Sequence, residues 1–166
     1  MKSVAAIPSK ILSLPHLVAE IRRWRLKNKT IAFTNGVFDI LHEGHIASLS
    51  QAASLADILI VAVNGDESVK RLKGPDRPIN NENSRALLLA SMAVSDAVII
   101  FHEDTPADLI KAILPDVLVK GGDYTIENIA GASDVLANGG KVVLADIVQG
   151  ISTTGIIKKI QTYQGS

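Results

Sequence analysis

A chain of 166 residues is long enough to bury one substantial core, and 47% hydrophobic with 20% charged residues is typical of a globular domain. Seventeen basic side chains balance seventeen acidic ones, so the basic excess typical of a nucleic-acid-binding protein is missing, and we expect no nucleic acid partner. The absence of cysteine excludes disulfides and thiolate zinc sites, which fits the cytoplasm. The longest purely apolar run, residues 58–63, is too short to cross a membrane, and no membrane partner is expected.

The predicted elements begin with an amphipathic helix over about residues 14–27, in which Leu17, Ile21 and Trp24 recur at helical spacing. Apolar strands then alternate with helices along the chain. Strands are predicted at residues 31–34, 58–63, 97–101, 117–119 and 142–147. Helices are predicted at residues 44–55, 68–72, 82–94, 133–136 and 152–163, and from an N-cap at Thr105 with Pro106 at the first helical position.

This alternation of apolar strands with helices predicts an α/β fold. We expect a doubly wound, Rossmann-like parallel sheet of five strands with helices on both faces. Because no linker divides the sequence, residues 1–166 are expected to form a single domain. The N-terminal helical segment, about residues 1–28, is expected to pack on it.

Polar residues gather where each predicted strand ends. His42–His45 follow the first strand, Asn64–Asp66 the second, His102–Asp104 the third, residues 120–123 the fourth and residues 149–152 the fifth. The carboxyl ends of parallel strands share one edge of the sheet, and ligands bind at that edge where the strand order reverses. The five segments are therefore expected to converge on one crevice.

The two histidines His42 and His45 stand three residues apart at the start of a predicted helix, with Gly44 between them. At this spacing they share a helix face, and Gly44 leaves room for a ligand. A pair of structural histidines is one interpretation, and a metal site is disfavoured because His-Glu-x-x-His needs a spacing of four. We favour a phosphate site, because a helix N-terminus offers free N–H groups and both rings donate to oxygens that gain charge.

A second phosphate site is predicted at Ser152, Thr153 and Thr154, which open the last helix. Three hydroxyls at a helix start form an ordinary N-cap, which on its own is the better interpretation. They also form an anion cradle together with the free amides. Two cradles at one sheet edge indicate a polyphosphate held at both ends.

Two basic residues and a glycine turn complete the predicted site. Lys73 lies in a basic, turn-rich stretch, and such a stretch is ordinarily a solvated loop. Its position after the second strand, facing the same crevice, favours a contact between Lys73 and phosphate. Arg85 either pairs with a phosphate oxygen or lies on the helix surface, and the sequence does not separate these. After the fourth strand, Gly121 and Gly122 either form a plain turn or allow a base or sugar to approach, with Asp123 accepting from hydroxyls.

The motif Gly36-x-Phe38-Asp39-x-x-His42-x-Gly44-His45, together with Ile151–Thr154, resembles the cytidylyltransferase-like nucleotidyltransferases. Within that family, residues 33–160 resemble the nucleotidyltransferase domain of the bacterial heptose 1-phosphate adenylyltransferases. Four further segments are similar to that subgroup, namely residues 71–74, 104–106, 118–124 and 152–160.

The resemblance implies transfer of AMP from ATP to D-glycero-β-D-manno-heptose 1-phosphate, giving ADP-heptose and pyrophosphate for the lipopolysaccharide core. It implies a homo-oligomer, and a separate sugar kinase is expected because these 166 residues hold no kinase half. His42, His45 and Lys73 are the expected catalytic residues, and Mg²⁺ the expected cofactor with Asp39 as a candidate ligand. The expected nucleotide-binding residues are Thr34, Asn35, Gly36, Val37, Phe38, Gly44, Arg85, Lys120, Gly121, Ser152, Thr153 and Thr154. The expected substrate-binding residues are Asn64, Asp66, Gly122, Asp123 and Tyr124.

Two departures and two alternatives accompany this hypothesis. Gly65 stands where the subgroup is expected to carry serine, and no arginine precedes Ser152, which disfavours CTP. The nearest alternative is a cytidylyltransferase that acts on glycerol 3-phosphate or another small phosphate. An alternative of another class is a non-catalytic nucleotide-sensing module, against which the intact His42, His45 and Lys73 count.

Overall fold

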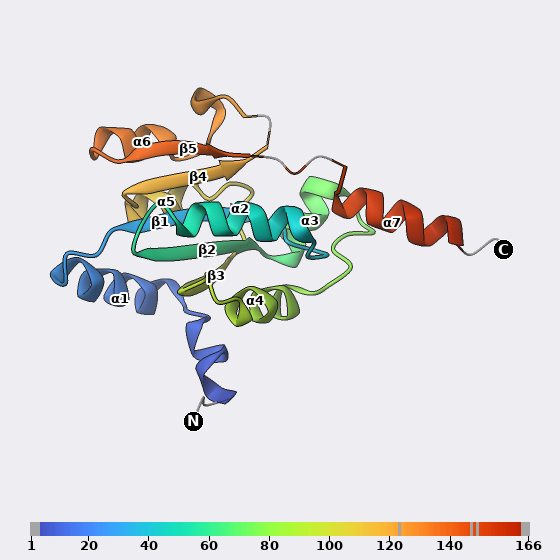
Figure 1. Cartoon of the computed structure of the whole chain (residues 1–166), viewed down its shortest axis with the longest axis horizontal. Coiled ribbons are helices and arrows are strands. Elements are labelled where there is room, and N and C mark those ends of the chain that lie inside the picture. Colours follow the sequence, from blue (N-terminus) through green and yellow to red (C-terminus); the bar gives the residue numbers. More distant parts are fainter. Residues whose placement is uncertain (1–3, 123, 147, 149, 164–166) are drawn as a thin grey trace.

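The computed structural model describes residues 4–122, 124–146, 148 and 150–163. Within them a single parallel sheet runs in the order β3-β2-β1-β4-β5 (Figure 1). The strands are β1 (Ile31–Gly36), β2 (Ile58–Asn64), β3 (Ala97–Phe101), β4 (Val117–Gly121) and β5 (Lys141–Ala145). The strand order reverses between β1 and β4, so the switch point where ligands bind lies beside the end of β1.

Helices cover both faces of the sheet, as predicted. Their bounds are α1 (Leu14–Leu26), α2 (Glu43–Ala53), α3 (Asp66–Lys73), α4 (Glu82–Ser91), α5 (Ala107–Ile113), α6 (Ala132–Ala137) and α7 (Thr153–Thr162). Short 3-10 turns lie at η1 (Val4–Ala6), η2 (Pro8–Lys10) and η3 (Ile126–Asn128). No helix in the described part of the chain has the length and apolar character needed to span a membrane.

Two apolar clusters, one on each face, hold the helices to the sheet. Phe33 of β1 packs with residues of α1, α5 and α6, whereas its neighbour Ala32 packs with residues of α2 and α4. This follows from the strand geometry, because successive side chains point to opposite faces. Each fully buried Leu, Ile or Phe contributes about 1.5–3 kcal/mol, so this doubly covered sheet is a rigid base for the loops at its edge.

The N-terminal segment lies along the β3 edge of the sheet. Ile11 forms a parallel bridge with Val98, and the Lys10 Nζ donates to the Ser95 carbonyl at 2.7 Å. Leu17 and Ile21 of α1 are buried in the core. The outermost strand on that side is therefore covered instead of being left open to another chain.

The predicted helix and strand bounds differ from the structure by a few residues, and one predicted cap is wrong. α5 begins at Ala107 with Pro106 as its N-cap, because the Ile110 N–H donates to the Pro106 carbonyl; Thr105 thus precedes the cap. α4 ends at Ser91 because Met92 is extended. The last strand ends at Ala145 among the described residues, and the predicted Ile147 and Gln149 positions lie outside them.

Candidate active site

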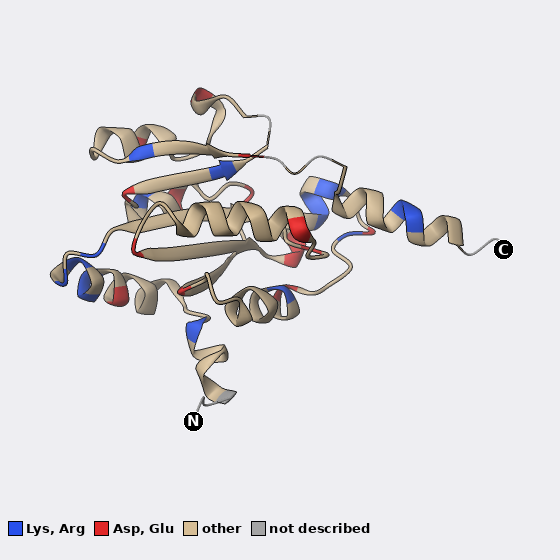
Figure 2. Cartoon of the chain, in the orientation of Figure 1, with Lys and Arg blue, Asp and Glu red and all other residues tan. Residues whose placement is uncertain are grey.

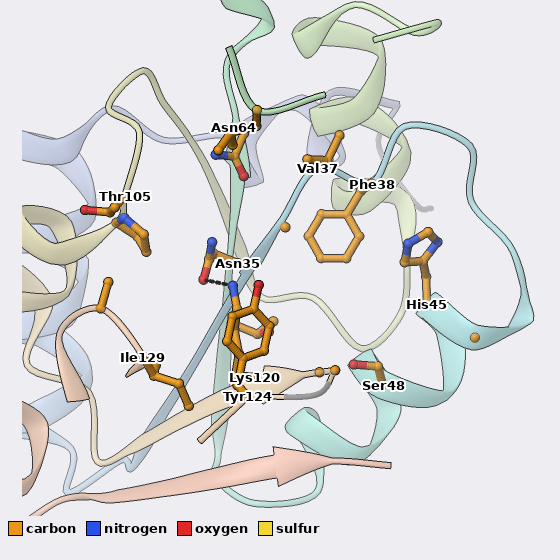
Figure 3. Close-up of a pocket in the computed structure, with 18 of the residues that line it drawn as sticks. Asn35, Val37, Phe38, His45, Ser48, Asn64, Thr105, Lys120, Tyr124 and Ile129 are labelled. Atoms are coloured by element: carbon orange, nitrogen blue, oxygen red, sulfur yellow. Dashed lines mark hydrogen bonds between the residues drawn. The ribbon is translucent and has the colours of Figure 1, made fainter. Parts of the chain in front are cut away.

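A cavity of about 530 Å³ opens at the carboxyl edge of the sheet, at the switch point (Figure 3). Residues that follow each of the five strands line it, which confirms the predicted convergence on one crevice. The predicted site residues in its lining are Thr34, Asn35, Gly36, Val37, Phe38, His42, Gly44, His45, Asn64, Lys73, Lys120, Gly121, Gly122 and Tyr124. Asp123 lies outside the described residues.

The two histidines lie together at the start of α2, as their spacing predicted. His42 is the N-cap of the helix, and the His42 and His45 rings stack with centroids 3.9 Å apart and planes 27° from parallel. The Phe38 ring meets His45 edge-on at 5.3 Å, and Phe38 adopts a positive φ of 50°. A Cβ at Gly44 would lie 3.1 Å from the His42 ring, so a larger residue at this position would crowd that ring.

Both imidazoles have an unsatisfied buried nitrogen. The Nδ1 atoms of His42 and His45 have no hydrogen-bond partner among the described residues. Burial, reinforced by His42, lowers the pKa of His45 to about 4; burial also lowers the pKa of His42, against the opposing charge of Glu43. Both rings are therefore neutral at neutral pH. An incoming anion would favour their charged form, because an opposite charge nearby raises a histidine pKa.

A second cavity of about 260 Å³ adjoins the first and shares His45, Phe38, Val37 and Lys73 with it. Its other lining residues include Ser152, Thr153 and Thr154 at the start of α7. The N-cap interpretation of this segment is confirmed, because the Ser152 Oγ accepts from the Gly155 N–H at 3.0 Å. The anion-cradle interpretation stays a prediction. The structure thus brings the second predicted cradle beside the histidine pair.

Lys73 is the last residue of α3 and lines both cavities. It is exposed and has no ion-pair partner in the described parts of the chain, in contrast to its neighbour Arg71, which pairs with Asp104 at 2.6 Å. Figure 2 shows the basic residues of α3 beside the start of α7. Lys73 is thus a free cation at the junction of the two cavities.

On the β4 side, Lys120 is fixed by two contacts. Its Nζ donates to the Asn35 Oδ1 at 3.1 Å and lies 5.2 Å from the centre of the Tyr124 ring (Figure 3). Burial lowers the pKa of Lys120. This wall of the cavity, away from His45, combines an aromatic face, a cation and the Gly121–Gly122 backbone.

Arg85 lines neither cavity and is not on the helix surface, so the structure supports neither of its two predicted interpretations. Its side chain is fully buried, and it donates to the Val37 carbonyl at 2.7 Å, the Asn80 carbonyl at 2.8 Å and the Asp66 carboxylate at 2.6 Å. Each of the three guanidinium nitrogens thus has a protein partner, and the buried group is not presented to a ligand in the cavity. Asp66, predicted to bind substrate, is the partner of Arg85 and lines neither cavity.

Asp39, a predicted candidate metal ligand, lines the smaller cavity, and protein donors already engage its carboxylate. Its buried carboxylate accepts from the Arg77 Nε at 2.7 Å and from the N–H groups of Ile79 and Asn80 at 2.9 and 2.8 Å. Burial on its own would raise the pKa of Asp39, but these donors outweigh it and hold the pKa below its ordinary value. Among the described residues, no group of three or more histidine or carboxylate side chains is placed to hold a metal.

The lining also contains residues that the sequence did not single out as site residues. They are Ser48, Leu72, Thr105, Pro106, Asn128, Ile129, Ala130, Asp146 and Val148, together with Asp104 and Ile151 from two of the clusters predicted to converge there. Asp104 to Pro106 follow β3, so the rule that placed the other clusters was a signal for them. No such signal in the sequence indicated residues 128–130, because they do not directly follow a strand. They reach the carboxyl edge of the sheet through the long connection after β4.

Gly65 lies against the His102 imidazole. A Cβ at Gly65 would come too close to the His102 Nδ1, so the exposed His102 side chain would have to move to admit a serine there.

The fold and the site define a Rossmann-like α/β domain with two adjoining cavities at the switch point of its sheet. The model of the family described as cytidylyltransferase-like matches residues 33–159, which is more than half of the chain. The chain therefore belongs to the cytidylyltransferase-like family of nucleotidyltransferases.

Curated relatives and solved structures agree with this assignment. The chain is 53% identical to the bifunctional protein HldE of Hyphomonas neptunium and 51% identical to that of Paramagnetospirillum magneticum, over 92% of its own length in each case. It spans only 31% of the length of those relatives.

Among solved structures, the lipopolysaccharide core biosynthesis protein from Thermoplasma volcanium is similar at 32% identity and a TM-score of 0.61. That match covers 73% of this chain and 99% of the other. Pantoate-beta-alanine ligase from Francisella tularensis, at 15% identity and a TM-score of 0.58, shares the fold. That match covers 93% of this chain and 77% of the ligase.

Proposed function

We propose that this chain transfers AMP from ATP to D-glycero-β-D-manno-heptose 1-phosphate, forming ADP-heptose and pyrophosphate. The observation that carries the proposal is that Lys73 shares one cavity with His45 and the Ser152–Thr154 helix start and the adjoining cavity with the stacked His42–His45 pair. This arrangement offers donors along the length of a triphosphate. The similarity to HldE proteins and to a lipopolysaccharide core biosynthesis protein supports the choice of acceptor.

In the proposed reaction, an oxygen of the sugar phosphate attacks the α-phosphorus of ATP. A new P–O bond forms there while the bond from the α-phosphorus to the bridging oxygen breaks, and pyrophosphate leaves with that electron pair. The attacking oxygen is already ionised at neutral pH, so no general base is needed. Catalysis then depends on in-line positioning and on donors for the developing charge.

Each donor has a distinct role in this proposal. His42 and His45 donate to the α- and β-phosphate oxygens, and Lys73 neutralises charge on the α-phosphate and the leaving pyrophosphate. Ser152, Thr153 and the free amides of α7 hold the β- and γ-phosphates. The triphosphate raises the pKa of His45 from about 4, so the ring becomes a stronger donor once ATP is bound.

We propose that Mg²⁺ enters with ATP, since the described residues present no ready cage for it. When bound, the ion would offset part of the negative charge of the phosphates. The Lys120, Asn35 and Tyr124 wall is proposed to receive the base and ribose, because it combines an aromatic face with a fixed cation.

The cellular setting is proposed from the same reasoning. We propose a cytoplasmic enzyme that works on small molecules, as a homo-oligomer and without nucleic acid. The balanced charge supports the last point, and the half-exposed Leu87 and Leu88 on α4 offer an apolar patch for self-association.

A panel of substrates tests the proposed reaction. Pyrophosphate release is measured with ATP or CTP against heptose 1-phosphate or glycerol 3-phosphate. Release that requires both ATP and heptose 1-phosphate is the expected result. Release only with CTP or only with another acceptor would overturn the substrate assignment, and ATP binding without release under any pairing would favour the sensing module.

A further inference from the structure

The turn Val37–Ile40, between β1 and α2, is tied to segments on both sides of the smaller cavity. Arg85 donates from α4 to the Val37 carbonyl at 2.7 Å. The Thr153 hydroxyl donates from the start of α7 to the Ile40 carbonyl at 3.2 Å. The turn therefore connects the start of α7 to the start of α2, where the two histidines lie.

Asp39 ties the same turn to the α3–α4 loop, residues 74–81. Its side chain is fully buried and accepts from Arg77, Ile79 and Asn80, while the Asn80 side chain donates back to the Asp39 carbonyl at 2.6 Å. A buried carboxylate must keep such donors, because losing them leaves a costly uncompensated charge. The loop is thus held in one place on the turn.

Lys73 immediately precedes this loop, and three residues separate it from Arg77. The other side of the turn carries Phe38, whose ring meets His45 edge-on at 5.3 Å. Asp39 therefore joins the loop that follows Lys73 to the turn that carries Phe38 beside His45. Lys73 ends α3, and its exposed side chain is unpaired in the described chain, so both α3 and the loop that follows it set its place.

We propose that Asp39 is a positioning residue, which holds the α3–α4 loop on the Val37–Ile40 turn and so fixes Lys73 opposite His45. The effect on kcat rests on the proposed function, whereas the effect on ATP affinity can be measured whether or not the proposed function is right. A buried ion pair often adds little to the stability of a protein. We therefore assign to Asp39 and Arg77 the role of holding the loop in one conformation.

Asp57 offers a matched control at the opposite edge of the sheet. Its carboxylate accepts from the Thr30 N–H, the Thr30 hydroxyl and the Lys29 Nζ, each at 2.9 Å, where β1 and β2 begin. It lines neither cavity. An Asp57→Asn change should lower Tm and leave ATP affinity and kcat within about twofold of wild type.

A double-mutant cycle tests the proposal. Asp39→Asn, Lys73→Ala and the double variant are compared by ATP titration calorimetry, by kcat and by Tm. We expect Asp39→Asn to weaken ATP binding and to lower kcat about tenfold in wild type, and to change either by less than about twofold once Lys73 is alanine. Equal effects in both backgrounds, or no effect in either, would overturn the proposal.

Arg77→Gln is a milder variant that replaces Asp39→Asn in the double-mutant cycle if the Asp39→Asn protein does not fold. It removes the ion pair and leaves the two backbone N–H bonds to Asp39 in place. A loss of about threefold to tenfold that vanishes in the Lys73→Ala background supports the inference. Wild-type protein that binds ATP but releases no pyrophosphate would defeat the proposed function, and the ATP-binding cycle would still decide on Asp39. Absence of ATP binding by wild type would overturn both.

Discussion

The two helix starts that frame the cavity differ in how they are held. α2 buries Leu49 and Ala52 in the core, and its start carries a stacked histidine pair with an aromatic ring against it. α7 buries none of its described residues and extends away from the sheet (Figure 1). The first cradle is preorganised, and the second is held by a side-chain cap and one hydroxyl bond. We expect the first to act on the transition state and the second on substrate binding.

The largest effect is expected from His45→Ala. Loss of one preorganised transition-state donor typically lowers kcat by about a hundredfold or more. ATP affinity should change little, because α7 and Lys73 still hold the phosphates. Steady-state kinetics and calorimetry on the same preparation separate the two quantities. A kcat near that of wild type would remove His45 from the proposed mechanism.

The preorganised cradle should also leave a signature in the pH dependence of stability. Folding lowers the pKa of His45 from its ordinary value of 6.5 to about 4, so between these values the unfolded chain binds the additional proton. Stability from this group is therefore present above pH 6.5 and is lost as pH falls toward 4, at up to about 1.4 kcal/mol per pH unit. Thermal unfolding of wild type and His45→Gln across this window measures it. Parallel curves for the two proteins would contradict the assigned pKa.

A smaller effect is expected from Thr153→Val at the α7 cradle. The change removes the hydroxyl that donates to Ile40 and keeps the shape of the side chain. Because this bond exists before ATP binds, its loss weakens ATP binding only through a looser α7 start, by at most about 1 kcal/mol, the contribution of a net hydrogen bond, or about fivefold in affinity. The kcat should stay within about twofold of wild type. A fall in kcat with unchanged affinity would reverse the roles assigned to the two helix starts.

The same contrast explains what could be predicted from the sequence. The strands and the shared edge followed from apolar runs and from the polar clusters behind them, because strand direction alone brings those clusters together. The His42–His45 pair followed from helical spacing. Both inferences use only residues that are close together in the sequence, and the start of α2 has the structure that they predict.

Arg85 and Asp39 could not be placed by local rules. Spacing does not tell whether a charged side chain faces a cavity or lies buried, and both are held by the α3–α4 loop folding back on the β1–α2 turn. The contact between Lys120 and Asn35 likewise joins β4 to β1, which are adjacent only because the strand order reverses there. The contacts that escaped prediction are thus long-range polar ones.

Label transfer from ATP tests the central claim most directly. The protein is incubated with heptose 1-phosphate and ATP labelled with ³²P at either the α or the γ position, and the products are separated. The account predicts that the α label enters the sugar nucleotide and the γ label leaves in pyrophosphate. Transfer of the γ label to the sugar phosphate, or failure of the α label to reach any sugar product, would contradict it.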